Sequence, residues 1–147
     1  MKVMTKRFGE ITISSQDVIE FPQGIPGFAE NKRFVLLKEG QGPFFWLQSL
    51  EDPSLAFVVT NPLFFAPDYR IKLHRSQLRD IELEDLTKGE VWVFVSIRRD
   101  PFRVTMNLQA PVLVNRENGL AKQVLLPPEE YPLQYEILRA EREEVAS

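Results

Sequence analysis

The sequence predicts an all-β fold: a small antiparallel, β-barrel-like domain with one or two short helices. The chain has 147 residues, of which 44% are hydrophobic and 11% aromatic, enough to build one core. Its 11 prolines and 7 glycines are spread along the chain, so they interrupt helical patterns and favour short strands joined by turns. Closing such strands into a barrel protects their edges. We expect a single domain over residues 1–138, followed by a charged C-terminal tail, residues 139–147, that frays.

The first half of the chain divides into short strands separated by turn sequences. Gly9 separates the first two strands, and Pro26-Gly27 suits the central positions of a type II turn. Glycine and proline also separate the last three strands of this half, which predicts an antiparallel meander. The strands expected here cover residues 3–8, 10–13, 17–21, 34–38, 44–50 and 55–60.

The second half contains one long apolar segment and several shorter ones. Residues 90–99 are apolar on both faces, which predicts a central strand, and the Asn118-Gly119 pair predicts a hairpin. Residues 68–75 alternate apolar and basic side chains and predict a half-buried strand, while Ser76 is expected to cap a short helix. The remaining strands are expected at residues 103–108, 110–115 and 120–126, with a further strand or helix around 131–138.

Charge and composition exclude several classes of function. The formal net charge is −3 and the pI about 5.3, whereas dedicated nucleic-acid-binding domains are strongly basic. The absence of cysteine excludes disulfides and thiolate metal sites. The chain has neither a signal-peptide pattern nor an apolar run near the roughly 18 residues that span a bilayer. We expect a cytoplasmic protein with no membrane contact and no cofactor.

No catalytic or metal-binding pattern stands out. His74 is the only histidine, and no serine lies in a Gly-x-Ser-x-Gly turn. Residues 80–85 begin with the acidic spacing of a calcium loop, but Asp85 stands where that loop needs glycine. We therefore expect a protein that is not an enzyme, and an acid/base hydrolase using Glu51, Asp52 or His74 ranks last among the alternatives.

A predicted hairpin tip carries a second alternative. Arg98, Arg99 and Arg103 surround Phe102, and a basic set with an aromatic ring can bind single-stranded nucleic acid. Asp100 and the acidic pI weaken the potential that a phosphate backbone would meet there. A small β-barrel nucleic-acid-binding protein is therefore the second-ranked function.

Six segments, taken together and in order, resemble the FliW family of bacterial flagellar assembly factors. Each segment alone is weak, but their joint occurrence through nearly the whole chain is specific. One departure is Asn61, where the family pattern has an acidic residue before the proline. The matching segments are FGEITI (8–13), FPQGIPGF (21–28), PFFWLQSLEDPSLAFVVTNP (43–62), PDY (67–69), NLQAPVLVN (107–115) and QVLL (123–126) followed by Tyr131.

The resemblance implies a compact, barrel-like, non-enzymatic regulator with two alternative protein partners. In this family FliW binds the RNA-binding translational repressor CsrA, which relieves repression of flagellin mRNA, and it also binds flagellin. Flagellin that accumulates then occupies FliW and frees CsrA, so that synthesis is matched to export. We expect the same partners here, no direct contact with nucleic acid, and a monomer.

Two sets of side chains form the candidate partner-binding surface. Apolar residues of a proline-bounded loop suit a groove for an amphipathic helix, although burial in the protein's own core is the more frequent outcome for Phe and Leu. A nearby acidic set suits a basic regulator. The candidate residues are Leu63, Phe64, Phe65, Asp68, Tyr69, Glu82, Glu84 and Asp85.

Overall fold

A computed structural model describes residues 1–38 and 40–139. The expected tail therefore lies outside the described residues, apart from the backbone of Arg139. The helical segments are short: α1 (Arg75–Arg79) and the 3₁₀ helices η1 (Ser15–Asp17), η2 (Pro62–Phe64) and η3 (Leu86–Lys88). The strands are β1 (Lys2–Thr5), β2 (Gly9–Thr12), β3 (Ile19–Glu20), β4 (Arg33–Lys38), β5 (Phe44–Ser49), β6 (Ala56–Thr60), β7 (Glu90–Arg99), β8 (Phe102–Met106), β9 (Val112–Asn115), β10 (Leu120–Gln123) and β11 (Tyr135–Arg139).

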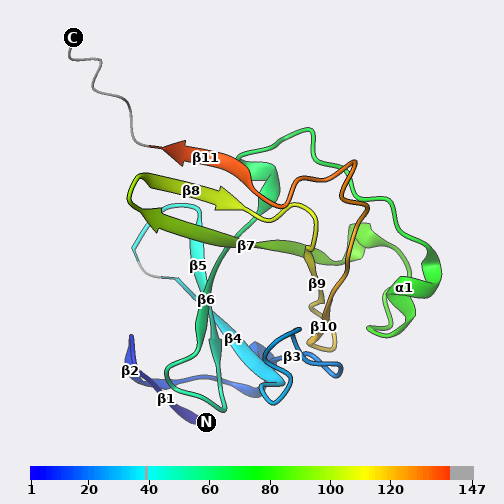
Figure 1. Cartoon of the computed structure of the whole chain (residues 1–147). Coiled ribbons are helices and arrows are strands. Elements are labelled where there is room, and N and C mark those ends of the chain that lie inside the picture. Colours follow the sequence, from blue (N-terminus) through cyan, green and yellow to red (C-terminus); the bar gives the residue numbers. More distant parts are fainter. Residues whose placement is uncertain (39, 140–147) are drawn as a thin grey trace.

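Strands β3 to β7, together with β9 and β10, close into a ring (Figure 1). The nine-stranded sheet runs in the order β11-β8-β7-β6-β5-β4-β3-β10-β9, and the first part of β7 also pairs with β9. Strands β4, β5 and β6 form the predicted antiparallel meander. The prediction of a small barrel-like β fold with short helices is confirmed. One pairing, β3 with β10, is parallel, so the sheet is mixed rather than wholly antiparallel.

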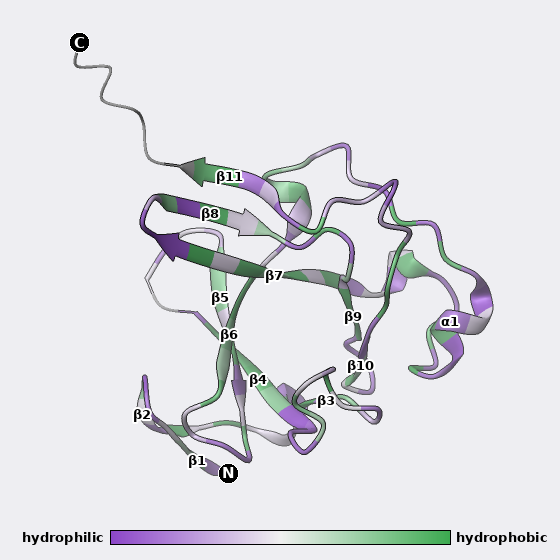
Figure 2. Cartoon of the chain, viewed as in Figure 1, coloured by the Kyte–Doolittle hydropathy of each residue, from purple (hydrophilic) through white to green (hydrophobic). Residues whose placement is uncertain are grey.

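The main core lies inside this ring. It includes Phe21, Phe34 and Val59, none of which exposes any surface. Phe57 on β6 stacks on Phe94 of β7 with ring centroids 4.8 Å apart, an arrangement that aromatic pairs favour. Figure 2 shows β7 as hydrophobic along most of its length and hydrophilic at its tip, as expected of a strand that passes through the core and then leaves it.

Residues 68–75 do not form the predicted strand. The alternation itself was interpreted correctly, because Tyr69, Ile71 and Leu73 pack against a second cluster, which includes Leu113 of β9 and Val124 just after β10. Within the part of the chain that the structure describes, however, no strand pairs with this segment. The alternation of apolar and polar residues therefore shows that one side of this extended segment is buried. It does not show that the segment pairs with a strand.

Helix α1 begins two residues earlier than predicted. The N-cap residue is His74, not Ser76, and the Gln77 side-chain carbonyl accepts a hydrogen bond from the His74 backbone N–H at 2.9 Å. Ser76 lies inside the first turn, where its hydroxyl cannot act as the cap. No helix in the described part of the chain is long and apolar enough to cross a membrane.

Candidate functional site

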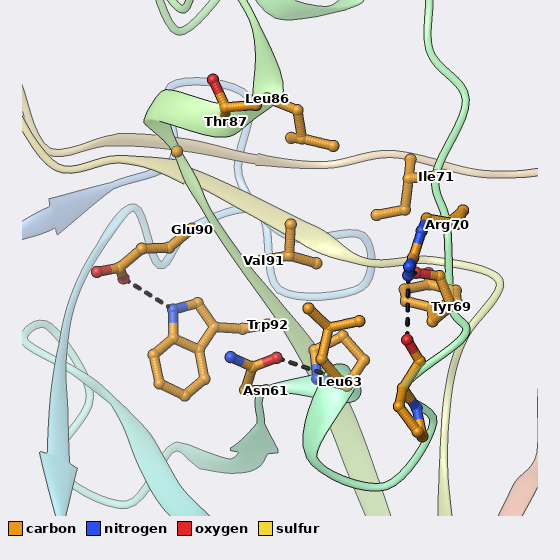
Figure 3. Close-up of a pocket in the computed structure, with 13 residues that line it drawn as sticks. Asn61, Leu63, Tyr69, Arg70, Ile71, Leu86, Thr87, Glu90, Val91 and Trp92 are labelled. Carbon is orange, nitrogen blue, oxygen red and sulfur yellow. Dashed lines mark hydrogen bonds between the residues drawn. The ribbon is translucent and has the colours of Figure 1, made fainter.

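An apolar cleft of about 690 Å³ opens beside the start of β7. One wall comes from η2 and the segment after it, the other from η3, and β7 forms the floor (Figure 3). In this view Trp92 lies at one end of the cleft and Arg70 at the other. A cleft of this size and lining accommodates large apolar side chains. Its principal apolar lining residues are Leu63, Tyr69, Ile71, Leu86, Val91 and Trp92.

The wall at η2 is set by its local sequence. Asn61 caps the short helix, because its side-chain oxygen accepts a hydrogen bond from the Leu63 backbone N–H at 2.9 Å. Pro62 occupies the start of the helix and is buried. As a result, Leu63 and Phe64 point outward, with 49% and 65% of their surfaces exposed. Exposed apolar side chains next to an apolar cleft are typical of a protein-binding surface.

Phe65 lies differently from its neighbour. It is half-buried, its ring stacks on Phe44 with centroids 5.7 Å apart, and it packs against the cluster that includes Val95 and Met106. Phe64 meets Phe65 in a T-shaped pair, with ring centroids 5.0 Å apart. The two phenylalanines thus differ: the Phe64 side chain is exposed and available to a partner, whereas the Phe65 side chain packs within the fold.

Tyr69 anchors the opposite part of this wall. Its hydroxyl donates to the Leu108 carbonyl at 2.7 Å, and its ring meets Tyr131 edge-on at 5.8 Å. Burial, assisted by the neighbouring Tyr131, raises the pKa of Tyr69 far above its usual value, so the phenol stays protonated. Tyr131 in turn donates to the Arg70 carbonyl at 2.6 Å. Asp68 is exposed and lines a smaller cleft of about 450 Å³ on the other side of Tyr69.

The floor contains residues that the sequence analysis did not select. The Trp92 indole N–H donates to Glu90 at 3.0 Å, and the Trp92 ring packs edge-on against Phe45 at 5.0 Å. Glu90 also pairs with Arg116 at 3.2 Å. The sequence feature that could have identified these residues is the apolar character of both faces of residues 90–99. A strand of that kind must be covered on both sides.

The three acidic candidates lie in a different hollow from the cleft. Glu82, Glu84 and Asp85 line it together with Arg75 and Arg79. We call these three residues the acidic rim. All three are exposed, and Asp85 directly precedes the cleft residue Leu86, the first residue of η3.

Two members of the acidic rim already have local partners. Asp85 accepts hydrogen bonds from the Thr87 hydroxyl and backbone N–H, and these bonds lower the pKa of Asp85. Glu84 pairs with Lys88 at 3.0 Å and raises the pKa of that lysine. The Asp85 carboxylate therefore stays charged at neutral pH.

Polar side chains from β9, β10 and an N-terminal loop hold the segment from α1 to the acidic rim. Asn115 donates to the Ile81 carbonyl at 2.8 Å. Asp80 accepts from Lys122 at 2.8 Å and from Gln23 at 2.9 Å. These bonds, with the burial of Ile81, fix the position of the acidic rim against the ring.

The residues of the hydrolase alternative have structural roles. Glu51 accepts hydrogen bonds from the backbone N–H groups of Lys32 and Arg33, and Asp52 accepts from Ser54 within the β5–β6 turn. His74 is the exposed N-cap of α1. Among the described residues, no group of three or more acidic or histidine side chains is arranged to hold a metal ion.

The residues of the nucleic-acid alternative lie at the tip of the β7–β8 hairpin. Arg98 pairs with Arg103 across the two strands, and Arg99 pairs with Phe102. Directly paired residues share a face of a sheet and successive residues alternate, so Phe102 lies on the face opposite Arg98 and Arg103. The aromatic ring and these two arginines do not form one surface.

Comparison with known proteins gives a consistent result. The family described as "FliW protein" matches residues 2–137. The flagellar assembly factor FliW of Alkaliphilus metalliredigens is 37% identical over 140 residues, covering 94% of this chain and 86% of that protein. The flagellar assembly factor FliW of Syntrophus aciditrophicus is 40% identical over 140 residues, covering 95% and 89%. A crystal structure of the flagellar assembly factor FliW superposes with a TM-score of 0.85 and 36% identity, covering 94% of this chain and 97% of the other.

Proposed function

The chain belongs to the FliW family of flagellar assembly factors, which are not enzymes, and we propose that it regulates flagellin synthesis in the cytoplasm by binding two proteins as alternatives. One partner is the translational repressor CsrA, whose repression of flagellin mRNA is relieved while it is bound. The other is flagellin, which competes with CsrA and so releases it when flagellin accumulates.

The observation that carries this proposal is the apolar cleft with exposed Leu63 at its edge and Phe64 beside it. A helix of a partner can insert two or three apolar side chains into such a groove while its polar residues remain at the rim. Central apolar anchors supply most of the binding energy in interfaces of this kind. The cleft therefore suits docking of an amphipathic helix, and such a helix is the form in which we propose that either partner engages it.

The acidic rim supports the choice of a basic regulator as one partner. Glu82, Glu84 and Asp85 are exposed and held in place by the bonds to β9 and β10. A fixed acidic group beside an apolar groove accelerates encounter with a basic protein and orients it. Binding of CsrA should accordingly weaken with salt more than binding of flagellin.

The test is isothermal titration calorimetry with purified flagellin and purified CsrA, each alone and then in competition. We expect each to bind, and each to reduce binding of the other. Leu63→Ser should weaken binding of at least one partner by about tenfold, since loss of one large apolar contact in an interface costs on the order of 1–2 kcal/mol. Its melting temperature should stay close to that of the wild type, because Leu63 is half exposed.

Leu125→Ser is the matched control, because Leu125 is 73% exposed and does not line the cleft. It should change neither affinity. The proposal fails if neither protein binds, or if both bind at once without mutual effect. The location of the site fails if Leu63→Ser and Leu125→Ser behave alike.

A further inference from the structure

Arg70 lies at one end of the apolar cleft and is held in place by its surroundings (Figure 3). Its guanidinium Nη1 donates to the Pro67 carbonyl at 3.0 Å and to the Tyr69 carbonyl at 2.8 Å. Its own carbonyl accepts from the Tyr131 hydroxyl at 2.6 Å. The Nε and Nη2 groups have no partner among the described residues. These two groups form the edge of a guanidinium that binds a carboxylate through two parallel hydrogen bonds, so Arg70 presents an unused carboxylate-binding edge.

Asn61 offers a second unused donor on the same wall. Its side-chain oxygen caps η2 by accepting from the Leu63 backbone N–H at 2.9 Å. Its Nδ2 group has no partner within the described part of the chain. Figure 3 shows Asn61 between Trp92 and Leu63, with Nδ2 directed away from Leu63. The amide therefore caps the helix and still leaves its N–H donors free.

The negative charge of the cleft is, by contrast, already paired. Glu90 contributes the only carboxylate among the described residues that line the cleft. It accepts from the Trp92 indole N–H at 3.0 Å and pairs with Arg116 at 3.2 Å. Arg70 has no ion pair among the described residues. The charge that the cleft leaves unpaired is therefore a positive one, and it is complementary to a carboxylate.

We propose that the cleft selects an amphipathic helix that carries a side-chain carboxylate one turn beyond its apolar anchors, and that Arg70 binds this carboxylate. Residues three or four apart share a helix face, so a carboxylate one turn beyond the anchors reaches the end of the cleft where Arg70 lies. Because Arg70 is already held by its hydrogen bonds, little further ordering is needed on binding. The neutral Asn61 keeps the wall free of opposing charge. This inference rests on the docking role proposed above and adds the chemistry of the helix.

Two other anionic ligands fit the cleft less well. Phosphorylated side chains are recognised by clusters of arginine, and Arg70 is the only arginine among the described residues of the lining. A free C-terminal carboxylate is captured by unpaired backbone N–H groups, but those of Leu63 and Phe64 are bonded to Asn61. A side-chain carboxylate is therefore the favoured ligand.

The test uses fluorescence anisotropy with the full chain and labelled, alanine-rich helical peptides that are amidated at the C-terminus. The acidic peptide has two leucines four residues apart and one glutamate a turn to either side of them. The control peptide has glutamine in place of both glutamates. We expect the acidic peptide to bind about two- to fivefold more tightly, the range for one exposed ion pair, with an advantage that shrinks as salt rises.

Three variants locate the origin of this advantage. Arg70→Gln should abolish it and leave binding of the glutamine peptide unchanged, because the apolar wall is not altered. Asn61→Asp should reduce it, because aspartate caps a helix as well as asparagine does but adds a negative charge to the cleft. Arg79→Gln is the matched control, since it removes an exposed arginine that does not line the cleft and should preserve the advantage.

The inference is overturned if the two peptides bind equally, if neither binds, or if Arg70→Gln and Arg79→Gln behave alike. It is also overturned if Arg70→Gln weakens both peptides to the same extent, because Arg70 then only supports the wall. A glutamine peptide with a free C-terminus that binds as tightly as the acidic peptide would assign Arg70 to a chain terminus instead. The calorimetry with CsrA and flagellin tests the proposed function separately, and that function can hold in each of these cases.

Discussion

At the scale of single residues, a few polar side chains determine where the candidate surfaces stand. The hydroxyls of Tyr69 and Tyr131 bond to backbone carbonyls of segments far away in sequence and so hold the outer wall of the cleft. Asn115 plays the same part for the acidic rim through the Ile81 carbonyl. Each of these hydrogen bonds is buried or partly buried. Loss of one partner therefore leaves the other polar group without a hydrogen bond from either protein or water, which destabilises the fold. The surfaces thus rest on side chains that no local pattern identifies.

Glu82 is the one described residue other than glycine with a positive φ, at 57°. In that region a side chain with a Cβ costs about 1–2 kcal/mol relative to glycine. Glu82→Gly should therefore raise the free energy of unfolding by about 0.5–1 kcal/mol, after allowance for the greater freedom of glycine in the unfolded chain. Urea denaturation monitored by tryptophan fluorescence measures this change.

Glu84→Gly provides the comparison, because Glu84 is also exposed but has no positive φ. That variant should destabilise the protein. If Glu82→Gly is equally destabilising, the backbone at this position is not strained in the way the structure indicates.

At the scale of elements, the segment from α1 to η3 is the part that secondary-structure patterns describe least. It has only five residues of α-helix, and it stays in place because Leu78, Ile81 and Leu83 are buried against β9 and β10. Its polar attachment runs through Asp80, which accepts from Lys122 and Gln23. The hydrogen bond from Lys122, then the hydrogen bond from Gln23 and the charge of Lys122, lower the pKa of Asp80 below its ordinary value of 3.8.

This lowered pKa predicts a pH-dependent contribution to stability. A carboxylate whose pKa is lower in the folded state stabilises the fold above its unfolded-state pKa, and that stabilisation is lost as the pH falls through the folded-state pKa. Asp80→Asn should therefore be less stable than the wild type at pH 7, and the difference should shrink towards zero as the pH is lowered below 3.8. Guanidinium denaturation across this range measures it.

Repeating the comparison of Asp80 with Asp80→Asn in a Lys122→Gln background tests whether Lys122 causes the pH dependence. With the principal partner removed, the pH dependence of the Asp80→Asn difference should be smaller. A difference that stays constant with pH in the wild-type background would contradict the assignment.

At the scale of the whole molecule, closure of the ring depends on one tight contact between distant segments. Strand β3 meets β10 through a single parallel pair, and the Glu20 backbone N–H donates to the Gly119 carbonyl at 2.7 Å. Gly119 has a φ of 76°, and a Cβ there would lie 2.7 Å from the Val18 carbonyl oxygen. The hairpin glycine thus also serves as the residue that lets the two ends of the ring approach.

Gly119→Ala should consequently destabilise the whole molecule by about 2 kcal/mol or more, from the positive φ and the clash together. Gly9→Ala is the matched control: its φ is 69°, but a Cβ there meets nothing within 4 Å. It should cost only the backbone strain, about 1 kcal/mol. Equal losses in the two variants, measured by thermal and chemical denaturation, would show that the β3–β10 contact is not tight.

Local sequence patterns predicted the β-rich class, the meander of β4 to β6, the central strand β7 and the hairpin at Asn118-Gly119. Periodicity and turn residues act over a few neighbouring positions, and they carry this information locally. The six ordered segments also indicated the family. The folded structure shows three features that these patterns did not predict. Residues 68–75 cover the ring without joining a sheet, Phe64 is exposed while Phe65 is half-buried, and Trp92 and Leu86 complete the cleft. These features depend on which distant segments meet when the ring closes, and local patterns do not record such contacts.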